Sequence, residues 1–84
     1  MKNLMTMKTY EFAPLDAPGH ITFFENSCFQ CGIKNEIYVF EKDYFLWKNG
    51  AFIQDAFPYL SHPQREVIKT GIHPECWQQI FSDN

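Results

Sequence analysis

The stretch Cys28-Phe29-Gln30-Cys31-Gly32 is the most informative part of this sequence, and a second stretch, His73-Pro74-Glu75-Cys76, repeats its spacing. Two intervening residues allow one backbone turn to bring both side chains of a pair to the same point. Gly32 allows the tight turn at residues 28–32, here called the knuckle, to fold back on itself. The two pairs therefore predict one shared site that joins the knuckle to a segment much later in the chain.

Cysteine thiolates and a histidine imidazole in this pattern are typical of a zinc site. Zn²⁺ takes four such ligands in structural sites, and three cysteines with one histidine are a standard set. The predicted ligands, which use every cysteine in the chain, are Cys28, Cys31, His73 and Cys76. Iron in the same ligand set is the alternative metal. Four protein ligands leave no open position, so the predicted zinc is structural and the chain is predicted not to be an enzyme.

Two other interpretations of the cysteines compete with a metal site. Cys28 and Cys31 could form a thiol–disulfide redox pair, but a thioredoxin-type motif opens a helix after a strand. The cysteines could also be small buried apolar residues, with His73 acting only as a helix N-cap. The matched second pair, which ends at Cys76, favours the metal site over both.

Strand and turn signals predict an antiparallel sheet of three or four strands. The β-branched and aromatic segments His20–Glu25 and Glu36–Glu41 suit strands. Asn49-Gly50 is the strongest two-residue hairpin signal, because both turn positions need a positive φ. It predicts a β-hairpin formed by Tyr44–Lys48 and Ala51–Phe57.

Helix punctuation is concentrated in the last third of the chain. Ser61 followed by Gln64 is a capping box, and Gly71 stands where a left-handed glycine ends a helix. These signals predict a helix from Ser61 to Thr70. A second short helix is expected to begin at His73. The predicted fold class is therefore α+β: a small antiparallel sheet with the knuckle and the hairpin, followed by two short C-terminal helices.

The length of 84 residues leaves room for one small core. Pro14, Pro18 and Gly19 interrupt residues 1–19, which we interpret as an N-terminal arm. Residues 20–84 then form a single zinc-stapled domain. Cores of domains below about 70–80 residues rarely contribute more than a few kcal/mol, and such domains often add a metal.

The formal net charge of −3 argues against two classes of binding partner, nucleic acids and membrane surfaces. Strong non-specific nucleic-acid binding and polybasic membrane binding both need many basic side chains. No apolar segment reaches the length of a transmembrane helix, and the first twenty residues contain no signal-peptide core. These features predict a cytoplasmic protein.

Aromatic residues make up 18% of the chain, and they admit three interpretations. The plain one is a core with scattered exposed rings. The functional one is an exposed patch for a protein partner, and nucleobase stacking is the third. Trp47 and Arg65 are the predicted partner-binding residues, because these residue types dominate interaction hot spots. The plainer interpretation of Arg65 is a helix-surface residue paired with a nearby carboxylate.

The order of knuckle, hairpin and a helix that begins with the His-x-x-Cys pair resembles treble-clef zinc domains. The resemblance implies that the knuckle and the last helix are joined through zinc. The predicted helix from Ser61 to Thr70 is a departure from that pattern.

The C-terminal half is similar to a family of short, uncharacterised proteins encoded by phages and bacterial mobile elements. The similar residues are Trp47-x-x-Gly50, Ile53-Gln54-Asp55-Ala56-Phe57-Pro58-x-Leu60-Ser61, Arg65-Glu66, Gly71-Ile72 and Pro74-x-Cys76-Trp77. The resemblance implies a bacterial host cytosol. The predicted function is a non-enzymatic zinc-binding module that acts on a host protein. A nucleic-acid-binding zinc domain is the alternative, and a thiol–disulfide redox protein the third.

Overall fold

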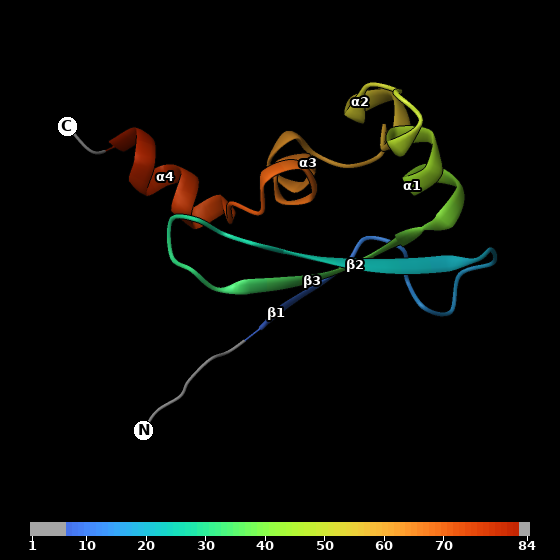
Figure 1. Cartoon of the computed structure of the whole chain (residues 1–84), viewed down its shortest axis with the longest axis horizontal. Coiled ribbons are helices and arrows are strands. Elements are labelled where there is room, and N and C mark those ends of the chain that lie inside the picture. The colour runs from blue at the N-terminus through green and yellow to red at the C-terminus, as the bar shows by residue number, and fades with distance from the viewer. Residues whose placement is uncertain (1–6, 83–84) are drawn as a thin grey trace.

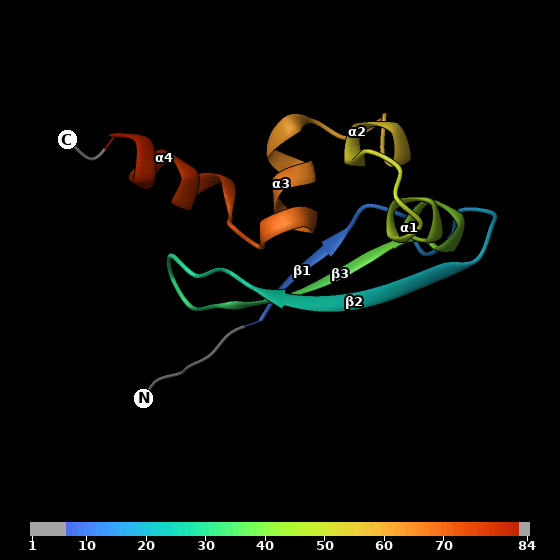
Figure 2. The same cartoon turned by 45° about the horizontal axis from the view of Figure 1, so that its top comes forward.

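The computed structural model describes residues 7–82, and it confirms the predicted α+β class. The helices lie on one face of a small sheet, and residues 7–82 place no helix on the other face (Figures 1 and 2). The elements in chain order are β1 (Lys8–Glu11), β2 (Ile21–Ser27), β3 (Lys34–Phe40), α1 (Glu41–Lys48), α2 (Ile53–Ala56), α3 (His62–Thr70) and α4 (Pro74–Ser82).

The sheet is mixed rather than antiparallel as predicted. Its order over the described residues is β1-β3-β2, with β2 and β3 antiparallel and joined by the knuckle. β1 lies inside the predicted N-terminal arm and pairs with β3 in parallel, with Tyr10 opposite Ile37. A four-residue strand is too short to show a clear alternation, and its parallel partner lies far along the chain.

The predicted hairpin around Asn49-Gly50 is wrong, because α1 and α2 stand in place of its two strands. Gly50 has a positive φ of 110°, as the hairpin prediction required, but it ends a helix. Its N–H donates to the carbonyl of Trp47, and the N–H of Ala51 donates to that of Leu46. This pair of bonds is a Schellman motif. A left-handed glycine serves both structures, so the turn signal could not distinguish them.

The two predicted C-terminal helices are confirmed as α3 and α4. The Ser61 hydroxyl accepts from the N–H of Gln64, whose side chain accepts from the N–H of Ser61. At the other end Gly71 has a φ of 83° and donates to the carbonyl of Val67. These local caps set the point at which the chain leaves α3 and turns toward α4.

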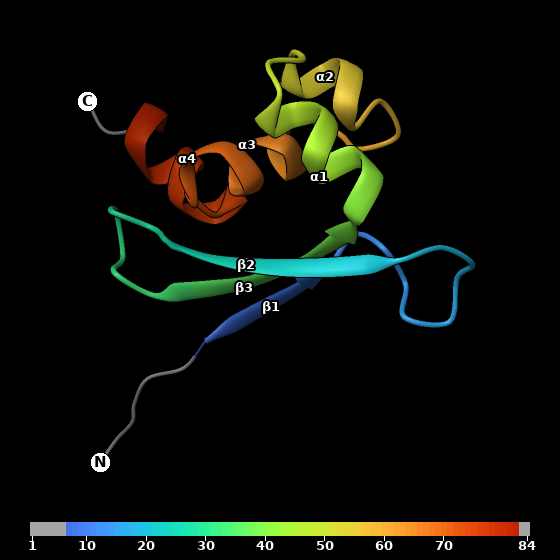
Figure 3. The same cartoon turned by 45° about the vertical axis from the view of Figure 1, so that its right-hand side comes forward.

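The described residues form two buried clusters. The main core lies between the sheet and the first three helices, and it contains Ile37, Val39, Ala56, Phe57, Leu60, Val67 and Ile68. The second is small and lies between the knuckle and α4, where Trp77 and Ile80 pack against Cys28, Ile72 and Cys76. α4 extends beside the knuckle and beyond the end of the sheet (Figures 1 and 2), and Figure 3 shows the same helix from the side. Within residues 7–82 no helix has both the length and the apolar character needed to cross a membrane.

Candidate metal centre

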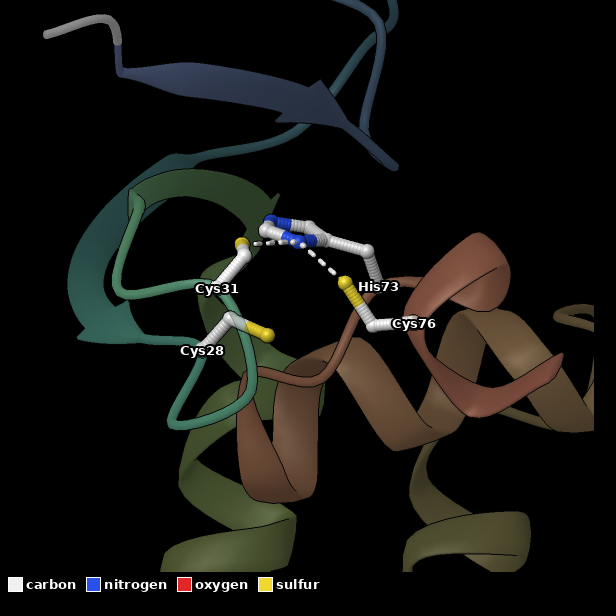
Figure 4. A group of neighbouring side chains, drawn as sticks. All are labelled: Cys28, Cys31, His73 and Cys76. Carbon is white, nitrogen blue, oxygen red and sulfur yellow. Dashed lines mark hydrogen bonds between the residues drawn. The ribbon is translucent and has the colours of Figure 1, made fainter. Parts of the chain in front are cut away.

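The structure brings the four predicted ligands into one cluster (Figure 4). The Sγ atoms of the three cysteines and one ring nitrogen of His73 all lie within 4.8 Å of one another. His73 Nδ1 is 3.4 Å from the sulfur of Cys31 and 3.6 Å from that of Cys76. Zinc bonds of about 2.3 Å to sulfur and 2.0–2.1 Å to nitrogen make the sulfur–nitrogen edge of a tetrahedron about 3.6 Å. The two sulfur–nitrogen distances therefore match the edge of one tetrahedral metal site.

Local backbone structure presents the two cysteines of the knuckle. The N–H of Cys28 donates to the carbonyl of Ile33, and the N–H of Gly32 donates back to the carbonyl of Cys28. Gly32 has a φ of 80°, a conformation that residues with a side chain rarely adopt. The turn leaves Cys28 buried and Cys31 exposed. One ligand thus faces the interior while the other covers the site from the solvent side.

The orientation of His73 is set by a buried asparagine that the sequence analysis did not identify. His73 Nε2 lies 2.6 Å from Asn35 Oδ1, and both residues are fully buried. The amide nitrogen of Asn35 donates to the carbonyl of Gly71 at 2.8 Å and to Asn26 Oδ1 at 2.9 Å. Because its N–H groups are used there, the Asn35 oxygen must accept a hydrogen bond from the Nε2–H group of His73. The Nδ1 lone pair of His73 is then free to face the sulfurs of Cys31 and Cys76.

Asn26 extends this chain of hydrogen bonds to the end of α3. Its amide nitrogen donates to the carbonyls of Val67 and Ile68 at 3.0 and 3.3 Å. Backbone carbonyls only accept, so these bonds establish which end of the Asn26 amide is nitrogen. Its oxygen must therefore accept from Asn35. The helix end, two asparagines and His73 form one continuous network, of the kind that orients metal-binding histidines.

We expect Asn35→Leu to lower the zinc affinity of the chain by about 10- to 100-fold, the range seen when such supporting groups are removed. Asn35→Asp keeps an oxygen acceptor for His73 and should lower the zinc affinity by less. Metal competition with a chromophoric chelator measures the affinity, and imidazole ¹⁵N shifts report which ring nitrogen carries the proton. Asn49→Leu, at the exposed end of α1, is the control. Equal affinities for Asn35→Leu and Asn49→Leu would contradict a positioning role.

The electrostatics of the cluster favour a bound cation. Burial alone would raise the pKa of the Cys28 thiol, but backbone N–H groups of Cys31, His73 and Gln30 lower it to about 7. Burial and the neighbouring Cys28 and Cys31 sulfurs raise the pKa of Cys76. Thiolates this close repel one another, and a divalent cation offsets that repulsion. Burial, followed by the charge of Lys8, lowers the pKa of His73, which keeps the imidazole neutral as metal binding requires.

β1 closes the site from the side of the sheet. The ring of Tyr10 stacks on His73 with centroids 6.2 Å apart and an interplanar angle of 22°. Lys8, two residues earlier, pairs with Glu75, which lies between the two C-terminal ligands. Both partners of this ion pair are partly exposed, so it contributes little stability. The predicted arm therefore supplies part of the wall around the ligands.

Trp47 and Arg65, the predicted partner-binding residues, lie outside the metal cluster and make internal contacts. Trp47 packs on Phe57 in the main core. Arg65 Nε donates to the carbonyl of Phe57 at 3.1 Å, and Nη2 donates to that of Pro58 at 3.3 Å. Partner binding by these two residues stays a prediction. Their substitution would also disturb the fold, so exposed residues are better probes of an interface.

The sequence contained only weak signals for the supporting residues. Asn35 and Asn26 occupy positions in strands, where asparagine is depleted, and a buried polar residue in a strand is a candidate for a specific hydrogen bond. Nothing in the sequence connected them to His73.

Comparisons with known proteins found no matching family model, curated protein or solved structure.

Proposed function

We propose that this chain binds one zinc ion through Cys28, Cys31, His73 and Cys76. The observation that carries the proposal is the clustering of four ligand atoms within 4.8 Å, with sulfur–nitrogen distances that match a tetrahedral site. Thiolate and imidazole donors in this geometry suit zinc. The oriented Nδ1 of His73 supports the same reading, since its other nitrogen is held by Asn35.

The proposed zinc is structural. Four protein ligands complete its usual coordination and leave no position for water or a substrate. The ligands come from the β2–β3 turn and from the start of α4, elements that a small apolar cluster also joins within the described residues. The ion therefore acts as a clip that holds α4 against the end of the sheet.

The role we propose for the clipped domain is non-enzymatic binding of a protein partner. Support comes from large apolar side chains at the surface of β2 and of the knuckle, where Phe23 is 51% exposed and Phe29 is 75% exposed. Exposed aromatic side chains are enriched in protein interfaces. The resemblance of the C-terminal half to phage-encoded proteins suggests that the partner is a host protein.

Elemental mass spectrometry of the purified, untagged chain should find one zinc per chain. Thiol titration on the same sample should find the three cysteines unreactive until a chelator is added, because bound thiolates are shielded by the metal. Replacement by Co²⁺ should produce the visible absorption of a tetrahedral thiolate site. Iron in stoichiometric amount would change the identity of the metal. Three reactive thiols in a metal-free chain would refute the site.

A further inference from the structure

The face of the sheet opposite the helices, here called the open face, has a distinct composition. Buried Asn35, Ile37 and Val39 of β3 point toward the helices, so the residues between them point the other way. The same alternation holds in β2, where Phe24 contacts α1 and Asn26 contacts α3. No helix of residues 7–82 covers the open face (Figures 1 and 3). Its apolar centre consists of Ile21, Phe23, Tyr38 and Phe40.

Phe23 and Tyr38 form a stacked aromatic pair at this centre. They are opposite each other in the antiparallel register, and their ring centroids are 5.4 Å apart. Phe23 is 51% exposed, which is high for a large apolar side chain in a strand. Ile21 and Phe40 are paired beside them. The strip is therefore continuous along the two strands, with Phe23 exposed and Ile21, Tyr38 and Phe40 partly buried.

Carboxylates border this strip. Glu25 and Glu36 are directly opposite each other in the register, and Glu11 of β1 is beside Tyr38. Burial, followed by the charge and hydrogen bonding of Glu36 and the charge of Glu11, raises the pKa of the Tyr38 hydroxyl. Within the strands as described, Lys34 at the knuckle end is the one basic residue on this face. Like charges directly opposite each other destabilise a sheet, and a cation between them relieves that cost.

We propose that the open face binds a protein segment in which arginine side chains alternate with apolar ones. A guanidinium group can stack on the exposed ring of Phe23, beside the partly buried ring of Tyr38, and pair with the carboxylates of Glu25 and Glu36. Nucleic acid fits poorly, because its phosphates would meet the carboxylates. A second copy of the chain also fits poorly, because two such faces would oppose like charges. The inference rests on the protein-binding role proposed above and specifies its surface.

A short synthetic peptide of alternating arginine and leucine is the probe, titrated into the zinc-loaded, ¹⁵N-labelled full chain. The amides of β2 and β3 should shift, and a peptide with glutamate in place of arginine should not bind. Combined Glu25→Gln and Glu36→Gln should weaken binding about tenfold, as expected for two exposed ion pairs. The same double variant should raise the melting temperature of the free chain, because the opposed charges are gone.

Matched variants on the helical side separate this surface from general charge attraction. Asp55→Asn makes the same kind of charge change on α2, and Phe52→Ala removes an exposed aromatic ring, as Phe23→Ala does on the open face. Both controls should leave the affinity within about twofold.

Several results would overturn the proposal. The first three are no binding of the arginine peptide, a loss of affinity with Asp55→Asn equal to that with the double variant, and amide shifts confined to the helices. The other two are displacement of the peptide by oligothymidylate and self-association of the chain through β2 and β3. Zinc content and thiol protection are measured on the same sample. A failure of the zinc site is therefore distinguishable from a failure of this surface.

Discussion

A chelator is expected to unfold α4 and the knuckle of the zinc-loaded chain. Structural zinc sites contribute on the order of 10 kcal/mol of apparent folding free energy, while whole domains are stable by only about 5–15 kcal/mol. Without the ion, α4 is held by the small cluster of Ile72, Trp77 and Ile80 and by the exposed Lys8–Glu75 pair. A helix of nine residues does not persist without tertiary contacts.

The sheet and the main core should outlast this loss, because the ligands contribute nothing to the cluster that contains Ile37, Phe57 and Val67. Hydrogen exchange should therefore show fast amides in α4 and residues 28–33 of the chelated protein, with slower amides in β3. Circular dichroism should show a partial loss of helix that added zinc reverses. Unchanged protection of α4 after chelation would contradict the proposed clip.

Substitution of one ligand should reproduce the effect of chelation. His73→Ala and Cys76→Ser each remove one of four ligands, and both should expose the same segments. His62→Ala is the matched control, because His62 is an exposed histidine in the first turn of α3. Its zinc content should stay at one per chain. Loss of zinc in His62→Ala would mean that the ligand set has been assigned wrongly.

The second large effect is expected for Gly71→Ala. A Cβ atom at Gly71 would lie 2.5 Å from the backbone oxygen of Ser27 and 3.2 Å from Asn26 Oδ1. A backbone atom cannot rotate away, so α3 and β2 must separate. The left-handed backbone adds about 1–2 kcal/mol and the overpacking about 1–3 kcal/mol, a combined cost of about 2–5 kcal/mol. The separation would also displace Asn35 from His73, so zinc affinity should fall as well.

Gly32→Ala separates the two contributions to that cost. Gly32 has nearly the same φ, 80° against 83°, but a Cβ there would meet nothing within 4 Å. Gly32→Ala should therefore cost only the backbone strain of about 1–2 kcal/mol. Urea denaturation of zinc-loaded samples measures both variants. Equal destabilisation would show that the close approach of α3 and β2 has no energetic consequence.

Features that depend on short-range chemistry could be predicted from the sequence alone. The Ser61–Gln64 capping box and Gly71 mark the two ends of α3. They could be recognised in the sequence because their hydrogen bonds join residues only three or four positions apart. The grouping of Cys28 and Cys31 with His73 and Cys76 followed from residue type and spacing. The α+β class followed from the strand and helix signals together.

The prediction of a hairpin at Asn49-Gly50 was wrong because the same local signal is compatible with two structures. A positive φ at Gly50 ends a helix as well as it turns a hairpin. The preceding segment also carried Glu41 and Asp43 at its start and Lys48 at its end, the charge order that suits a helix dipole. The aromatic residues of this segment favoured a strand. In the folded protein, however, the segment is a helix that packs Tyr44 and Trp47 against Phe24.

The chain's sequence by itself determined which side chains can bind a metal and where α3 begins and ends. Only the tertiary structure decided how His73 is oriented, which strand joins β3 in parallel, and which face of the sheet stays open. The hydrogen bond between His73 and Asn35 spans 38 residues, and that between Asn26 and Val67 spans 41. An asparagine side chain can donate to and accept from many groups. Its partner is therefore selected by the packing that brings two distant segments together.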